Sequence, residues 1–178
     1  LLIQGQDAST PYDVSQPING PGADIKGIEV AFQHDFTFLP GALKHLGMVV
    51  NGTWFDGHLQ GKVGNTFVRL PLFNLSKWAA NATLYYEDKD WGVRVSDAYR
   101  SKYYTGLGTV GNVGDYIAAT HNIDFQAHVN LMKGVRLIAE GINLTNEPIE
   151  QFAGGPIARR VVYTTSGRTF TLGVSAEF

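Results

Sequence analysis

The last eleven residues of the chain alternate strictly between apolar and polar side chains. Between Arg168 and the terminal residue, every second position is apolar: Phe170, Leu172, Val174, Ala176 and Phe178. The positions between them carry threonine, glycine, serine and glutamate. A period of two without exception predicts a β-strand with one apolar and one polar face. This strand runs to an aromatic terminal residue, whereas most chains end in a frayed polar tail.

The same alternation recurs upstream and predicts an all-β chain. Five further segments show it: 27–38, 48–55, 77–87, 91–100 and 122–131. Segment 135–144 is strand-like without a clean register, and residues 1–5 resemble the end of a further strand. Asp97 interrupts the apolar side of its segment, which implies either a bulge or a position near a membrane interface.

The two faces of these strands favour a membrane barrel. A soluble β-sandwich exposes lysine and glutamate on its polar side, whereas here the polar side carries mainly Asn, Gln, Thr, Ser, His and Arg. Aromatic residues gather near the strand ends of the apolar side, as in the girdles of membrane barrels. They are Phe36, Phe38, Trp54, Trp78, Tyr86, Trp91 and Tyr99. We therefore expect an antiparallel up-and-down transmembrane β-barrel, with a soluble β-sandwich carbohydrate-binding module as one alternative.

The connections between the expected strands alternate in length. Segments 87–90 and 132–134 are tight turns and 39–46 is a moderate one. The segments 6–24, 58–70, 102–115 and 146–166 are long loops rich in glycine and proline. Outer-membrane barrels have short periplasmic turns and long external loops. When the strands are counted along this alternation of short and long connections, the last strand is predicted to end on the periplasmic side.

Composition excludes several classes of function. The formal charge is −2 over 178 residues, and the basic residues form no patch, which argues against nucleic-acid binding. There is no cysteine, and the five histidines lack metal-site spacing. Segment 106–111 fits G-x-G-x-x-G but is followed by an expected strand, so we interpret it as an external loop. We expect no enzyme activity, catalytic residue, metal or cofactor.

Several short sequence motifs, in the order in which they occur along the chain, resemble those of a known family. They are PINGPGADIKGIEV at 17–30, FTFLPG at 36–41, LSKWAANATLYYE at 75–87, AYRSKY at 98–103, GINLTNEP at 141–148 and YTTSGRTFTLGVSAEF at 163–178. Together they resemble the late strands of TonB-dependent receptors, closest to a proteobacterial group often linked to carbohydrate uptake. The resemblance implies that residues 1–178 are the C-terminal part of the barrel, about the last eight of about 22 strands. The plug domain, the energy-coupling box and the early strands would then be absent from this sequence, and the piece would be an open curved sheet with two bare edges.

The resemblance also implies a function and partners. It implies an active-transport receptor in the outer membrane of a Gram-negative bacterium, energised by the TonB complex through the plug. We expect its small-molecule ligand to be an oligosaccharide rather than a ferric siderophore; a passive porin-like barrel is the second alternative. Expected partners are outer-membrane lipid, lipopolysaccharide near Arg159, Arg160 and Arg168, and the barrel-assembly machinery, with no nucleic acid. The assembly signal would be carried by Phe170, Leu172, Val174 and Phe178.

The expected ligand contacts lie where the strand 91–100 opens into an external loop. Aromatic faces stack on the C–H faces of sugars, and amide and carboxylate groups bind hydroxyls. The candidate residues are Arg100, Tyr103, Tyr104, Asn112 and Asp115. For Arg94 and Arg100 a purely structural role is the alternative, in which they pair with luminal carboxylates such as Glu29, Asp35 or Asp124.

Overall fold

The computed structural model describes residues 20, 22–63, 66–107, 114–154 and 158–177. Seven antiparallel strands follow one another across its larger sheet, in the order β1-β2-β4-β5-β8-β9-β12, with β3 paired to β2. The strands are β1 (Ala23–Asp35), β2 (Leu46–Val63), β3 (Thr66–Pro71), β4 (Trp78–Glu87), β5 (Trp91–Arg100), β8 (Thr120–Met132), β9 (Val135–Ile142) and β12 (Thr169–Ala176). The predicted all-β, up-and-down class is confirmed. We call this sheet the wall.

A second, four-stranded sheet extends the wall at one end. Its order is β11-β10-β7-β6. Its strands are β6 (Tyr103–Leu107), β7 (Gly114–Ile117), β10 (Pro148–Ala153) and β11 (Arg159–Thr165). Each continues one strand of the wall, since β5 leads into β6, β7 into β8, β9 into β10 and β11 into β12. We call this smaller sheet the hairpin sheet.

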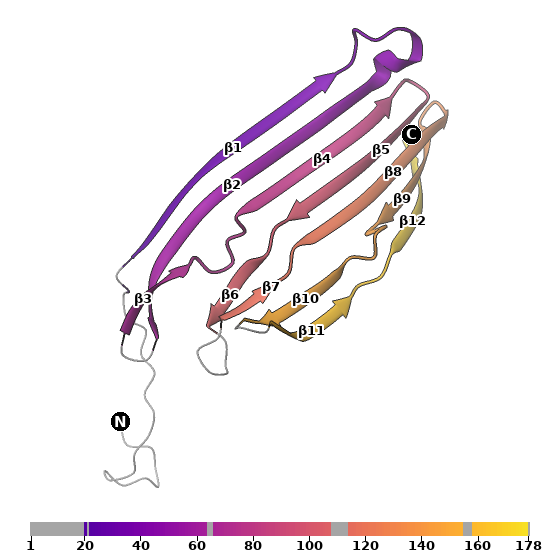
Figure 1. The fold of residues 1–178 in the computed structure, drawn as a ribbon. Helices are drawn as coiled ribbons and strands as arrows, with labels where there is room; N and C mark the ends of the chain where they lie inside the picture. Colours follow the sequence, from indigo (N-terminus) through magenta and orange to yellow (C-terminus); the bar gives the residue numbers. More distant parts are fainter. Residues whose placement is uncertain (1–19, 21, 64–65, 108–113, 155–157, 178) are drawn as a thin grey trace, which may run out of the picture.

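The two ends of the wall differ, as the alternating connections predicted. The end that we call the turn end carries the 3-10 helix η1 (Gly41–His45), the turns β4–β5 and β8–β9, and the last described residues of the chain (Figure 1). There the Glu177 N–H donates to the Gly134 carbonyl at 2.7 Å, which ties the chain's end to the β8–β9 turn. The opposite end, the hairpin end, carries β3 and the hairpin sheet.

The interpretation of three long segments as loops was wrong. Segments 58–70, 102–115 and 146–166 contain much of the β2–β3 hairpin, β6 with the start of β7, and β10 with β11. In the second and third of these segments clean alternation is lost because the pairing shifts between Tyr104 and Gly106 and between Gln151 and Phe152. A one-residue shift moves the following side chains to the other face, so a period of two cannot be read through it. Segments 6–19 and 1–5 lie outside the described residues.

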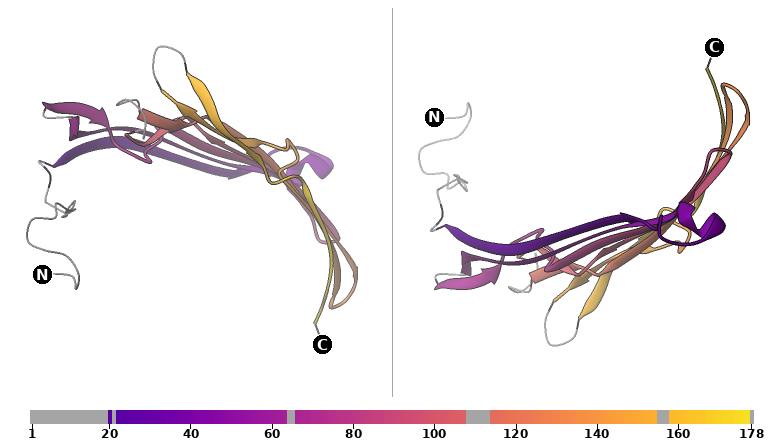
Figure 2. Two further views of the ribbon diagram at one scale, coloured as in Figure 1. Left: turned by 90° about the horizontal axis from the view of Figure 1, so that it is seen from below. Right: turned by 90° about the horizontal axis from the view of Figure 1, so that it is seen from above.

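Across the described residues the molecule has no apolar core. No hydrophobic side chain there is buried, and Leu172 on β12 is 87% exposed. Figure 2 shows the strands as a single curved layer. A β-sandwich needs two sheets packed face to face, so the soluble sandwich alternative is not supported. The apolar face must instead be covered by its surroundings.

The wall is open within the described residues. β1 and β12 lie at opposite edges and do not pair with each other, as expected for a piece of a larger barrel wall. No helix among the described residues is both long and apolar enough to span a membrane.

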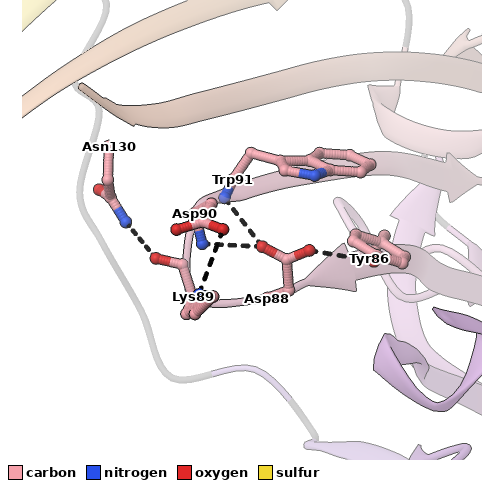
Figure 3. Close-up of polar contacts among 6 residues, drawn as sticks. All are labelled: Tyr86, Asp88, Lys89, Asp90, Trp91 and Asn130. Atoms are coloured by element: carbon pink, nitrogen blue, oxygen red, sulfur yellow. Dashed lines mark hydrogen bonds and ion pairs between the residues drawn. The ribbon is translucent and has the colours of Figure 1, made fainter.

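The turn between β4 and β5 is held by one aspartate (Figure 3). The Asp88 carboxylate accepts hydrogen bonds from the backbone N–H groups of Asp90 at 2.8 Å and Trp91 at 3.0 Å. These bonds hold the pKa of Asp88 below its usual range, because they stabilise the ionised form. The Asn130 side chain of β8 donates to the Lys89 carbonyl at 2.8 Å and links this turn to the next strand.

Candidate functional site

A row of side chains crosses all four strands of the hairpin sheet. Tyr104 pairs with Tyr116, Tyr116 with Phe152, and Phe152 with Arg160. Residues paired directly across antiparallel strands lie on the same face. We call Tyr104, Tyr116 and Phe152 the aromatic row.

The rings of the aromatic row contact one another in sequence. The centroids of Tyr104 and Tyr116 lie 5.9 Å apart with the rings tilted by 58°. Tyr116 and Phe152 are stacked, with centroids 5.4 Å apart and planes 12° from parallel. Both spacings lie in the favourable range for aromatic pairs. The row is therefore a continuous aromatic strip across the hairpin sheet.

Two cations lie over this strip. The Lys102 ammonium is 5.4 Å from the centroid of Tyr116. The Arg160 guanidinium is 5.8 Å from the centroid of Phe152 and 5.2 Å from that of Tyr163. Arg160 also donates to the Glu150 carboxylate at 2.8 Å. These distances suit cation–π attraction and leave both cations near the surface.

Arg100 is engaged within the chain. Its Nε donates to the hydroxyl of Ser76, which is 7% exposed, at 2.6 Å, and its Nη2 donates to the Asn74 carbonyl at 2.9 Å. Its guanidinium also lies over the Tyr103 ring, 3.8 Å from the centroid. The alternative of a structural role is thus supported, although its partners are a hydroxyl and a carbonyl rather than the carboxylates considered. Arg100 holds the β3–β4 connection against β5 and β6.

The other expected ligand residues do not form one cluster. Tyr104 belongs to the aromatic row, whereas Tyr103 and Asp115 are adjacent in sequence to row residues and so point to the opposite face. Asn112 lies outside the described residues. Lys102, Tyr116 and Phe152 were not among the expected ligand residues, because they are brought together only by strand pairing that the sequence pattern did not reveal.

Asn143 fixes the bend between the wall and the hairpin sheet. Its Nδ2 donates to the Gly167 carbonyl at 3.0 Å and to the Ser166 hydroxyl at 3.3 Å, and its Oδ1 accepts from the Glu147 N–H at 2.8 Å. The residue is 8% exposed and has a φ of 56°, in the left-handed region that asparagine tolerates. One side chain therefore joins the β9–β10 connection to the β11–β12 connection.

The polar face of the wall is cross-linked toward the turn end. Tyr85 donates to Asp35, Gln126 donates to Glu140 at 2.8 Å, and His128 lies 3.3 Å from Glu87. Closer to the middle, Asn81 donates to Asn51 at 2.9 Å. These contacts link neighbouring strands and give this face a polar lining, as predicted for the side away from lipid.

The comparison with protein families decides the identity. A family described as "TonB dependent receptor-like, beta-barrel" matches residues 2–144. The chain belongs to this family. Receptors of the family are outer-membrane proteins of Gram-negative bacteria and serve TonB-dependent transport. Comparison with curated proteins and with solved structures gave no match.

Family membership explains the exposed apolar face of this receptor wall. A single β-layer without a core is stable when lipid covers its apolar side and every strand is paired in a closed barrel. On β12 the side chains of Phe170, Leu172 and Val174 all lie on that face and are 72%, 87% and 68% exposed. Phe178, the last member of the expected assembly signal, lies outside the described residues.

Proposed function

We propose that this chain forms part of the ligand-binding wall of an outer-membrane receptor that imports an oligosaccharide by TonB-dependent transport. The aromatic row is the observation that supports an oligosaccharide. Sugars present C–H faces that pack on aromatic side chains, and their hydroxyls need directional donors and acceptors beside those rings. Glu150 and Arg160 supply such groups next to Phe152.

The proposed orientation places the hairpin sheet outside the cell and the turn end in the periplasm. Short connections gather at one end of the wall and paired extensions at the other, which is the arrangement of outer-membrane barrels. In this orientation the aromatic row is accessible to ligands from the medium. The basic residues Arg159, Arg160 and Arg168 then lie on the side of lipopolysaccharide phosphates.

The remaining partners belong to the same proposal. The TonB complex would act through a plug domain inside the barrel. The barrel-assembly machinery would recognise the last strand through Phe170, Leu172, Val174 and Phe178. Deleting Phe178 should then lower the amount of receptor in the outer membrane without changing its synthesis, whereas an unchanged membrane level would exclude that role.

The receptor, inserted in outer-membrane vesicles, tests the proposed ligand class. Oligosaccharide libraries and ferric siderophores are compared by equilibrium binding, using the wild type and a Tyr116→Ala variant. Phe67→Ala is the matched control, because Phe67 is a 59% exposed aromatic on β3, outside the row. Loss of sugar binding in Tyr116→Ala alone supports the proposal. Binding of ferric siderophores and of no sugar would contradict it.

A transport assay separates this receptor from a passive porin. Active uptake should stop when a protonophore removes the proton gradient that drives the TonB complex. Uptake that continues unchanged would favour the porin-like alternative.

A further inference from the structure

We propose that the aromatic row takes an acidic oligosaccharide, in which sugar rings carry carboxylate groups, rather than a neutral one. The acidic specificity rests on the proposed function, since it concerns the ligand of the same row. It follows from the two cations above the row and from the shortage of carboxylates beside them.

The cations lie over neighbouring rings. Lys102 is placed over Tyr116 and Arg160 over Phe152, and the centroids of these two rings are 5.4 Å apart. That separation is close to the spacing of adjacent strands and to the width of one sugar ring. A sugar ring resting along the strip therefore meets both positive charges at its rim.

The charges around the row do not cancel. Arg160 is paired with Glu150, at 2.8 Å. Lys102 is exposed and, within the described part of the chain, lies within ion-pair distance of no carboxylate. Asp115 is on the opposite face of the sheet, because it is adjacent to Tyr116 in β7. Two cations and one carboxylate leave an excess positive charge on the face that carries the row.

An anionic sugar uses this excess better than a neutral one. Covering Lys102 with a neutral ring would remove water from the ammonium without supplying a negative partner, which costs free energy. A uronate carboxylate replaces that water with a charge-assisted hydrogen bond, while the C–H face of its ring packs on the aromatic strip.

A pair of probes that differ only in whether their carboxyl groups are ionised or methyl-esterified tests the inference. A short oligogalacturonate and its fully methyl-esterified form have the same rings and linkages, but the ester has no charge. Binding to the receptor in outer-membrane vesicles is measured for the wild type, Lys102→Met, Lys102→Arg, Tyr116→Ala and the control Phe67→Ala. A galactose phosphate oligomer serves as the phosphate-bearing probe.

The wild type should bind the acidic probe about tenfold or more tightly than the ester, as expected for one charge-assisted contact. Lys102→Met should remove most of that difference without weakening the ester, whereas Lys102→Arg should keep it. The difference should also shrink as the salt concentration rises. Phe67→Ala should bind both probes like the wild type.

Three results would overturn the acidic specificity in different ways. Equal binding of the two uronate probes, lost in Tyr116→Ala, would show a neutral-sugar site and leave the proposed function standing. Preference for the phosphate-bearing probe would assign the cations to phosphate, such as that of lipopolysaccharide. Binding of an anionic ferric siderophore, with no sugar bound, would reject both the acidic sugar and the proposed function.

Discussion

The Asp97 carboxylate of β5 and the His121 ring of β8 contact each other on the apolar face of the wall, with 3.2 Å between Oδ2 and Nε2. Asp97 pairs in unbroken register with Ala82 on one side and Ile123 on the other, so a bulge does not explain its position. Tyr99 is the next residue of β5 on the same face. Its ring meets the His121 ring edge-on, with 6.1 Å between the ring centroids. One oxygen of the carboxylate that the sequence pattern marked as an exception thus contacts a side chain on the next strand, whereas its Oδ1 has no hydrogen-bond partner among the described residues.

We expect Asp97 and His121 to be energetically coupled. Replacing His121 by alanine leaves a carboxylate on a lipid-covered face and should cost about 1 kcal/mol. Replacing both residues by alanine should recover that loss, because the uncompensated charge is gone. Urea unfolding of the barrel in detergent gives the free energies of unfolding of the wild type, the two single variants and the double variant, and hence the coupling energy. The exposed pair Lys89–Asp90, 3.8 Å apart, is the control and should show coupling near zero.

The β4–β5 turn should weaken in acid. The pKa of Asp88 is lowered in the fold, so its contribution is present above the ordinary value of 3.8 and is lost as the pH falls through the lower folded value. Asp88→Ala should remove this part of the acid sensitivity and speed hydrogen exchange at the amides of Asp90 and Trp91. Asp90→Ala, which removes only an exposed carboxylate, should leave the acid sensitivity and the hydrogen-exchange rates unchanged. Equal acid sensitivity in wild type and Asp88→Ala would refute the role of Asp88.

The Asn143 bend separates two energetic effects. Asn143→Ala should lower the free energy of unfolding by about 2–4 kcal/mol. It removes the side-chain hydrogen bonds at a buried site, and alanine is strained at positive φ with no such bonds to offset the strain. Asn143→Gly should cost less, since glycine adopts that φ freely but also loses the bonds. Urea unfolding gives the total, and hydrogen exchange at Glu147 reports the local loosening. Equal costs for the two variants would show that backbone strain plays no part.

A charge on β12 should reveal which face meets lipid. Leu172→Arg should destabilise the barrel by about 2–4 kcal/mol if Leu172 lies near the middle of the membrane. Thr171→Arg is the control on the same strand, because Thr171 faces the other way and pairs with Glu140. Its arginine should be tolerated. The temperature at which the barrel band shifts in a heat-modifiability gel ranks the variants, and the opposite ranking would reverse the assignment of the faces.

The wall could be predicted from sequence, and the hairpin sheet could not. Seven of the eight wall strands coincide with segments of period two or, for β9, with a segment of strand-like composition, whereas β3 lies mostly in a segment expected to be a loop. The periodicity survives there because one face meets lipid and the other meets polar groups along the whole strand. In the hairpin sheet both faces are partly exposed and two strands carry register shifts, so side-chain polarity no longer follows position.

The candidate site shows the same limit. Tyr104 was found because it lies shortly after a well-patterned strand, β5, which ends at Arg100. Tyr116 and Phe152 lie 36 positions apart in sequence and meet only through the pairing of β7 with β10. Arg100 has the residue type and place of a ligand contact, yet the buried Ser76 hydroxyl and a backbone carbonyl already hold it. Such competition between partners is visible only in three dimensions.

The bend at Asn143 insulates the membrane-spanning strands from changes outside them. Pairing stops at the end of β9 and begins afresh in β10, so the register shift at Gln151 and Phe152 is not carried back into the wall. Insertions or deletions in the hairpin sheet can therefore be accommodated while every wall residue keeps its face. Under the proposed function, such changes would alter ligand recognition and leave the anchoring of the wall in the membrane as it is.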